Sequence, residues 1–157
     1  MSLRYPIAFV LSLVCLAAPA WADYRAGEDA YYRGDYTTAF RELMPLAESG
    51  YAFSEYFLGL MYVKGEGVPR DSKEAVRWYR LAAEQGEARD QGNLGLMYAK
   101  GEGVLQDYVL AHMWFNLAAA QGEKVATDLR DSLAKKMTPA QIAEAQKLAA
   151  EWKPRDK

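Results

Sequence analysis

Few residues in this chain carry the side chains that acid–base, nucleophilic or metal chemistry requires. The 157 residues include one histidine, His112, and one cysteine, Cys15. A metal site built on several histidines therefore cannot form. Adjacent carboxylates such as Glu28 and Asp29 could do acid–base work, but charge pairs on helices usually form a solvated face. We interpret His112, near the start of a predicted helix, as a partly exposed surface residue.

The glycine motif Gly65-Glu66-Gly67 begins like a dinucleotide-binding fingerprint. It lacks the third glycine and follows a predicted helix instead of a strand, so neither its residues nor its structural context matches that fingerprint. The Gly-x-Ser-x-Gly elbow of serine hydrolases and the phosphate-loop pattern are both absent from the sequence. We therefore predict no catalytic, cofactor-binding or metal-binding residues and no enzyme activity.

The first 22 residues have the layout of a secretory signal peptide. Arg4 supplies the positive charge, residues 7–18 form the apolar run, and the chain then reads Ala20-Trp21-Ala22, a small-x-small cleavage signal. Twelve apolar residues are fewer than the ~20 that a membrane-spanning helix needs. We expect cleavage after Ala22 and a periplasmic or secreted mature chain.

Cys15 lies inside the segment that we expect to be removed. It follows Val14 instead of the small residue that a lipoprotein signal would have, so we do not expect lipidation. The mature chain would contain no cysteine and hence no disulfides, although its compartment would allow them. Its fold must be stabilised by packing alone.

The mature chain, residues 23–157, is long enough for one domain with a hydrophobic core. Without Arg4, 18 basic residues stand against 21 acidic residues, which gives a net charge of −3. No basic block occurs, so binding to nucleic acid, which depends on phosphate neutralisation, is not expected. No further long apolar segment follows, so we do not expect membrane insertion of the mature chain.

A repeat with a period of 36 residues dominates the chain. Residues 51–86 and 87–122 share 19 identities in 36 positions without a gap. The second half of this unit also recurs once earlier, within residues 24–50. We therefore divide residues 23–122 into three repeats, 24–50, 51–86 and 87–122, followed by a C-terminal segment, 123–157.

Each repeat is predicted to form two helices. In the middle unit the first helix ends at Gly65, where a C-terminal cap favours a left-handed residue. Asp71 is the predicted N-cap of the second helix, with Glu74 in the place that completes a capping box. Gly86 ends this second helix.

Small residues at repeated positions predict close helix packing. Gly59 lies inside a predicted helix, where glycine costs ~1 kcal/mol relative to alanine. That cost is offset if the missing side chain allows a neighbouring helix to approach, with Trp78 and Tyr79 filling the remaining space. We therefore expect Gly59 and its repeat partner Gly95 to face an adjoining helix.

The stretch LGLMYVKGEGVPRDSKEAVRWYRLAAEQG, residues 58–86, closely resembles the Sel-one-like repeat, a relative of the tetratricopeptide repeat. Both full units match its pattern of Leu-Gly-x-x-Tyr, Gly-x-Gly-Val, Asp, Ala-x-x-Trp and Ala-Ala-x-x-Gly. The first unit departs from this pattern, because it has Gly34 alone where the other units have a six-residue connection between their two helices. The resemblance implies an exported bacterial protein with an all-α fold, a right-handed α/α solenoid of antiparallel helix pairs.

Residues 123–157 are predicted to form a capping helix pair with a short tail. Val125, Leu129 and Leu133, four apart, indicate one buried helix face. The run Thr138-Pro139-Ala140-Gln141 supplies an N-cap, a proline at the first helical position and a capping-box glutamine. A solenoid needs such a cover for its last repeat. The final residues, 153–157, are expected to be frayed.

The first helices of the repeats provide a candidate binding surface. In tetratricopeptide-like folds these helices line the concave wall, so the resemblance implies that one stripe of each faces a groove. Aromatic and basic residues on this stripe would suit a peptide or protein tail with acidic groups. The alternative is that the aromatic residues pack against neighbouring helices. The candidate groove residues are Tyr24, Tyr31, Phe53, Tyr56, Lys64, Arg89 and Lys100.

We therefore predict a non-catalytic scaffold or adaptor for protein–protein interaction in the bacterial cell envelope, with a protein or peptide partner in the concave groove. Two alternatives remain open. The first is an envelope hydrolase on the same scaffold, which an acidic–histidine cluster would support; none is visible. The second is an assembly factor for exported polysaccharide, a role of longer repeat proteins in this family, against which the short groove of three units argues mildly.

Overall fold

The computed structural model describes residues 20–155, with side chains from residue 24 onward. This range contains eight α-helices and no strand. Apart from residues 20–22, which begin the first helix, the predicted signal peptide lies outside the described residues. None of the described helices is long and apolar enough to span a bilayer. The helices are α1 (Ala20–Tyr32), α2 (Tyr36–Glu48), α3 (Ala52–Lys64), α4 (Ser72–Glu84), α5 (Ala88–Lys100), α6 (Tyr108–Ala120), α7 (Lys124–Ala134) and α8 (Pro139–Glu151).

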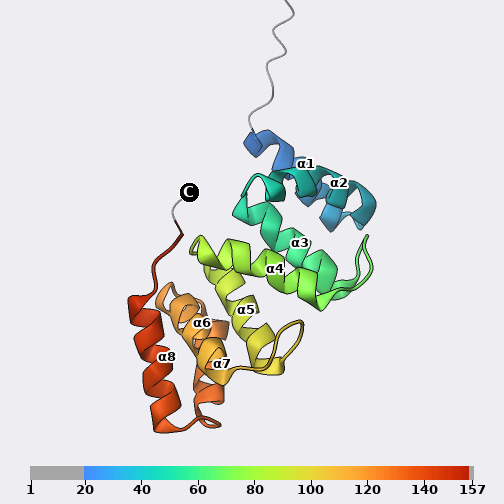
Figure 1. Cartoon of the computed structure of the whole chain (residues 1–157). Helices are drawn as coiled ribbons and strands as arrows, with labels where there is room; N and C mark the ends of the chain where they lie inside the picture. Colours follow the sequence, from blue (N-terminus) through green and yellow to red (C-terminus); the bar gives the residue numbers. More distant parts are fainter. Residues whose placement is uncertain (1–19, 156–157) are drawn as a thin grey trace, which may run out of the picture.

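The first six helices stack in chain order, and each packs mainly on the helix before it and the helix after it (Figure 1). Short connections join α1 to α2, α3 to α4 and α5 to α6, so each of these pairs is an antiparallel hairpin. The chain is thus an all-α helical solenoid, and the predicted fold class is confirmed.

The helices of the central hairpins begin and end where the sequence predicts. Gly65 and Gly101 follow α3 and α5 with φ of 71° and 69°, the left-handed conformation that glycine adopts without strain. The Asp71 carboxylate accepts hydrogen bonds from the main-chain N–H groups of Lys73 and Glu74 at the start of α4. These caps fix the length of each helix, and hence which residues face the next hairpin.

Glu74 does not complete the predicted capping box. Its carboxylate instead forms an ion pair with Arg77, with an N–O distance of 2.9 Å. The main-chain N–H of Asp71, which the box would engage, donates to the carbonyl of Tyr62 at 3.0 Å. The fold of the connection between α3 and α4 gives this N–H a partner that the sequence pattern does not reveal.

Glycines inside the first helices lie against large side chains of the second helices. A Cβ built on Gly59 would lie 2.5 Å from Cε1 of Tyr79, and one built on Gly95 would lie 2.8 Å from Cδ1 of Phe115. Real Cβ atoms do not approach other carbons this closely, so neither site accepts a side chain unless its neighbour moves. The prediction that these glycines allow close helix packing is confirmed.

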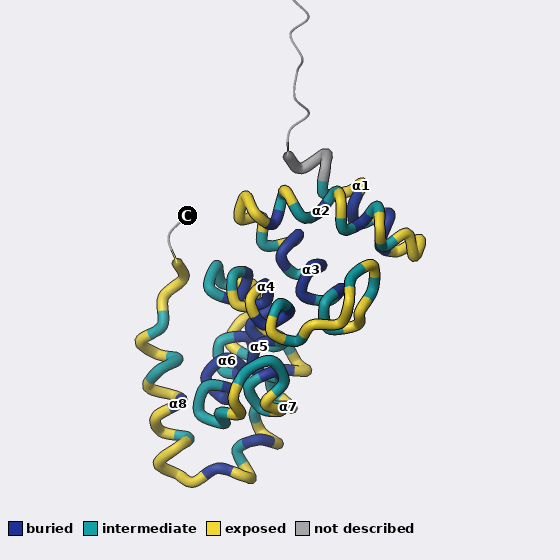
Figure 2. The backbone as a smooth tube through the Cα atoms, turned by 45° about the vertical axis from the view of Figure 1, so that its right-hand side comes forward, coloured by how far each residue is buried: buried dark blue, intermediate teal, exposed yellow. Residues whose placement is uncertain are grey.

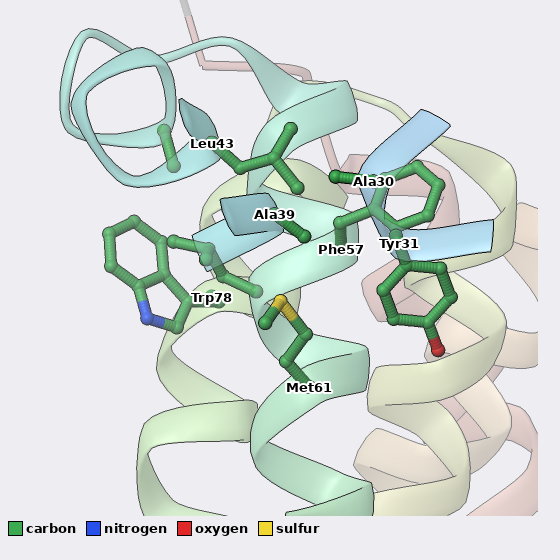
Figure 3. Close-up of a cluster of buried hydrophobic side chains, with 9 residues drawn as sticks. Ala30, Tyr31, Ala39, Leu43, Phe57, Met61 and Trp78 are labelled. Atoms are coloured by element: carbon green, nitrogen blue, oxygen red, sulfur yellow. The ribbon is translucent and has the colours of Figure 1, made fainter. Parts of the chain in front are cut away.

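Buried side chains from successive helices form a continuous core between the layers. Figure 3 shows the first cluster, in which Leu43 of α2, Phe57 and Met61 of α3 and Trp78 of α4 meet. The equivalent tryptophan of α6, Trp114, is buried in the next cluster. Both tryptophans are core residues, as predicted.

The C-terminal helices do not form a hairpin like the others. Helices α7 and α8 each pack on α6 instead of mainly on each other. In α7 the buried face contains Ala126 and Leu133, whereas Val125 is 67% exposed. The prediction for Val125 was wrong, because Ala126 takes its place on the buried face together with Leu129 and Leu133. Figure 2 shows α3 largely buried within the stack, whereas α8 presents mostly exposed residues.

Helix α8 begins with the predicted capping box, since the Thr138 hydroxyl and the Gln141 side chain exchange hydrogen bonds with each other's main chain. The chain beyond α8 is not frayed as far as the described residues reach. The Arg155 N–H donates to the Glu84 carbonyl at 2.7 Å, and its guanidinium pairs with the Glu84 carboxylate at 3.1 Å. The expectation of a frayed tail is therefore wrong for residues 153–155.

Candidate functional site

The seven predicted groove residues do not share one surface. Three lie toward the C-terminal ends of their helices: Tyr31, Lys64 and Lys100. The other four come together beside the first turns of α3 and α5: Tyr24, Phe53, Tyr56 and Arg89.

Phe53 is the most prominent apolar side chain of the second group. Its ring lies 5.0 Å from the Tyr24 ring, edge to face, and 5.0 Å from the ring of Phe57 in the core. Phe53 is nevertheless 40% exposed. A rigidly held aromatic ring that still presents its surface to solvent is a common anchor in protein interfaces.

A hollow of about 450 Å³ lies beside Phe53, between the first turns of α3 and α5. The Arg89 guanidinium lies over the Tyr56 ring, 5.0 Å from its centroid, so this charge is held in place by a cation–π contact. We call this hollow the α3–α5 hollow. Its lining residues are Ala52, Phe53, Tyr56, Glu87, Ala88, Arg89, Asp90 and Glu123.

Asp90 is the unusual member of this set. Its side chain is 3% exposed, and its Oδ1 atom is buried without a hydrogen-bond partner. Burial, and next the carboxylates of Glu87 and Glu55, raise the pKa of Asp90 to about 8. The carboxyl group is therefore largely protonated near pH 7, and a cation brought into the hollow would favour its ionised form.

Sequence reasoning missed Asp90, because nothing in its neighbourhood marks it as buried. The equivalent residue one repeat earlier is Ser54, which is also buried and also lacks a partner for its hydroxyl. A position that holds a buried polar residue in two successive repeats is the signal that could have found it.

The charges of the α3–α5 hollow correct the predicted partner. The sequence suggests a basic surface for an acidic peptide, but Arg89 is the one basic residue in the lining, against the carboxylates of Glu87, Asp90 and Glu123. The two other predicted basic residues, Lys64 and Lys100, lie elsewhere. The lining therefore contains more acidic than basic side chains.

Tyr31 and Lys64 are engaged within the fold. Tyr31 is 7% exposed, and its hydroxyl donates to Glu66 Oε2 at 2.7 Å while it accepts from Lys64 Nζ at 3.0 Å. Burial and the Glu66 carboxylate raise the pKa of Tyr31 above its usual value. Tyr31 therefore cannot act as an open groove aromatic, because its ring packs in the core and its hydroxyl is already bonded.

Lys100, in the last turn of α5, borders a separate hollow of about 180 Å³. Leu96 and Leu133, from α5 and α7, also line it. Lys100 therefore does not contribute to the α3–α5 hollow, since Arg89 occupies the opposite end of the same helix.

His112 contradicts the sequence interpretation, since it is 3% exposed within α6. Its Nδ1 lies 3.3 Å from Nδ2 of Asn116. Burial, and next the charge of Arg130, lower the pKa of His112, so the ring is neutral at pH 7. Residues 24–155 also hold no cluster of three or more potential metal ligands.

Glu55 is a second buried acidic residue, and the equivalent position in the next repeat is Gln91. Glu55 is 2% exposed and accepts a hydrogen bond from the amide of Gln85 at 2.8 Å. At the equivalent place Gln121 donates to Gln91 at 2.9 Å. Burial raises the pKa of Glu55 to about 7, although the Gln85 hydrogen bond opposes this rise. The same contact is thus made once with an ionisable group and once with a neutral amide.

Comparison with known proteins identifies the family. The Sel1 repeat model matches residues 52–87 and again residues 88–123. A solved Sel1 repeat protein from Oxalobacter formigenes is 36% identical, with a TM-score of 0.66 over 72% of this chain and 88% of that one. The chain belongs to the Sel1 repeat family. No match was found among curated proteins.

A second structure similar to this Sel1 repeat protein is a protective antigen present in uropathogenic Escherichia coli strains, which displays an SLR fold. The two are 30% identical, with a TM-score of 0.81 over 86% of this chain. The present chain spans 30% of the length of that antigen. Sel1 repeat proteins generally mediate protein–protein interactions and typically serve as non-catalytic scaffolds.

Proposed function

We propose that this Sel1 repeat protein is a non-catalytic adaptor of the bacterial cell envelope that binds a protein or peptide partner at the α3–α5 hollow. The family's general role supports partner binding. The signal-like layout of residues 1–22 supports export. The site differs from the groove suggested by the sequence, because it includes Tyr24, Phe53, Tyr56 and Arg89 but not Tyr31, Lys64 or Lys100.

The observation that carries this proposal is the pairing of an exposed aromatic anchor with a buried carboxylate that lacks a partner. Phe53 offers apolar surface at the rim, and Asp90 offers inside a carboxyl group that a nearby cation would ionise. A lysine or arginine side chain of the partner would pack its methylene groups on Phe53 and Tyr56 and bring its charge to Asp90. Because the helices hold both groups in place, binding would require little ordering of this protein.

Co-purification from envelope extracts tests the proposal. Phe53→Asp removes the aromatic anchor at an exposed position, and Leu105→Asp makes the same kind of change at another exposed apolar residue, on the α5–α6 loop. We expect one partner to co-purify with the wild type and with Leu105→Asp, and to be lost with Phe53→Asp. Equal recovery with all three proteins would show that the hollow is not the binding site.

A further inference from the structure

Two grooves lie one repeat apart, and six of their equivalent lining positions carry the same residue type. The first groove lies between the end of α2 and the face of α4, and the second lies between the end of α4 and the face of α6. The first groove is lined by Ala47, Glu48, Gly50, Trp78, Leu81 and Gln85. The second groove is defined by the residues 36 positions later, which are Ala83, Glu84, Gly86, Trp114, Leu117 and Gln121.

The second groove is occupied by the C-terminal segment of the chain itself. The Trp152 ring lies edge to face with the Trp114 ring, at a centroid distance of 6.1 Å. A Cβ built on Gly86 would lie 3.9 Å from Cγ of Pro154 and 4.0 Å from Cη2 of Trp152. The groove therefore holds an aromatic ring and the proline that follows two residues later.

Glu84 fixes the end of this segment in two ways. Its carbonyl accepts the Arg155 N–H at 2.7 Å, and its carboxylate pairs with the Arg155 guanidinium at 3.1 Å. Trp152 has φ of −67° and ψ of 141°, so the chain leaves α8 in an extended conformation and runs toward the end of α4 (Figure 1). Trp152 to Arg155 thus occupy the second groove in the manner of an extended peptide ligand.

The first groove has the same walls but no such segment. It encloses a hollow of about 460 Å³, and nothing lies within 4 Å of a Cβ built on Gly50, the equivalent of Gly86. Glu48, the equivalent of Glu84, is exposed and forms no ion pair within the described residues. The indole N–H of Trp78 is buried without a hydrogen-bond partner. Glu48 and Gly50 are therefore free in the first groove, whereas Trp78 is buried and the Arg77 guanidinium lies over its ring.

Three lining positions differ between the grooves: Ser49 of the first corresponds to Gln85, and the other two differences define what the first groove would accept. Arg77 replaces Met113, and its guanidinium lies over the Trp78 ring at 4.5 Å, where it can stack on an incoming aromatic side chain. Glu55 replaces Gln91 and adds a carboxylate. Arg155 of the docked tail lies at the rim and contributes the opposing positive charge.

We propose that the first groove binds an extended segment of a partner protein that carries an aromatic residue and, three positions later, a basic residue. The aromatic ring stacks on the Arg77 guanidinium above Trp78, the basic side chain pairs with the Glu48 carboxylate, and the main-chain N–H of the basic residue donates to the Glu48 carbonyl. While the chain's own tail occupies the second groove, only its Arg155 reaches the rim of the first, so Trp152 cannot enter it, and the same holds for the tail of a second copy. The inference rests on the proposed role in partner binding but uses a separate site.

A peptide with the sequence of residues 148–157, LAAEWKPRDK, provides the probe. Titration of the fluorescently labelled peptide with the full protein should show one binding site per chain. Glu48→Lys should weaken binding by at least about tenfold, because it replaces an ion pair with a repulsion. The matched control Glu144→Lys, at an exposed position of α8, should leave the affinity unchanged. A peptide with alanine in place of tryptophan should not bind.

A second variant tests the equivalence of the two grooves. Trp152→Ala combined with Arg155→Ala should release the tail and raise the number of peptide sites from one to two. Absence of binding to the wild type, binding unaffected by Glu48→Lys, or a count that stays at one in the double variant would each overturn the proposal. Self-association of the wild type that the double variant abolishes would also overturn it, because the occupant would then be a second copy. None of these results depends on the α3–α5 hollow, so failure here and failure of the proposed function can be told apart.

Discussion

Gly59 lies directly against the ring of Tyr79, because a Cβ at Gly59 would stand 2.5 Å from Cε1 of that ring. The missing side chain brings α3 and α4 together, and this contact positions the α4 wall of the first groove. Gly59→Ala should lower the free energy of unfolding by about 1–3 kcal/mol, the usual cost of overpacking a core. Urea unfolding monitored by circular dichroism measures this change.

Gly92 supplies the matched control, since it lies inside α5 with nothing within 4 Å of a built Cβ. Gly92→Ala should raise the free energy of unfolding by about 1 kcal/mol, because alanine favours the helix and meets no neighbour. If both substitutions shifted stability in the same direction, close packing would not explain the glycine at position 59.

The stability of the protein should fall as the pH rises from about 4.5 to about 8. Burial raises the pKa of Glu55 to about 7 and that of Asp90 to about 8. Between the ordinary carboxyl pKa and these values the folded state holds protons that the unfolded state has lost, so raising the pH favours unfolding. Above both values the two states are equally ionised at these groups, and this contribution becomes constant.

Glu55→Gln should remove the Glu55 part of that decline, because the amide can make the contact that Gln91 makes with Gln121 in the next repeat. Melting temperatures measured from pH 4.5 to pH 9 check this, with the exposed Glu144→Gln as a control that should keep the wild-type slope. An unchanged slope in Glu55→Gln would mean that Glu55 ionises normally in the folded protein.

Tyr31→Phe should lower the free energy of unfolding by about 1–2 kcal/mol. The phenol hydroxyl donates to Glu66 at 2.7 Å in a partly buried place, and its loss leaves a carboxylate short of a partner. Tyr32→Phe, next in sequence but exposed, should change the value by less than about 0.5 kcal/mol. Equal effects of the two substitutions in urea unfolding would contradict the structural role of Tyr31.

The fold could be predicted because the residues that determine helix ends and helix packing occur in both full repeats. Gly65 and Asp71 mark helix ends through local backbone and side-chain chemistry, and Gly59 recurs 36 residues later beside the same small and large neighbours. These signals are local or periodic, so one sequence is enough to read them.

The errors arose where burial depends on distant parts of the chain. His112 is buried because α6 is covered by α5, α7 and α8 at once. The absence of any Asp, Glu, Lys or Arg from residues 108–120 was the available sign. Asp90 is buried where α5 packs into the stack, and Arg155 reaches Glu84 across about 70 residues of chain. No spacing rule within one helix reports such contacts.

The candidate site was predicted in part for the same reason. Helical spacing aligned Phe53 and Tyr56 correctly, and the repeat added Arg89. Spacing also aligned Lys64 with the two aromatics, but α3 is long enough to place this residue at its far end, beside Tyr31. The acidic residues of the α3–α5 hollow come from loops and first turns, which the stripe does not include.

Site-specific photo-crosslinking in cells tests the central claim most directly. A photoreactive amino acid at position 53 should yield a covalent adduct with one partner, and the same residue at position 105 should yield none. Asp90→Asn, which removes the ionisable carboxyl group but keeps the shape, should strongly reduce the adduct at position 53 without lowering the melting temperature. No adduct at position 53, or an adduct of equal yield at both positions, would contradict the account.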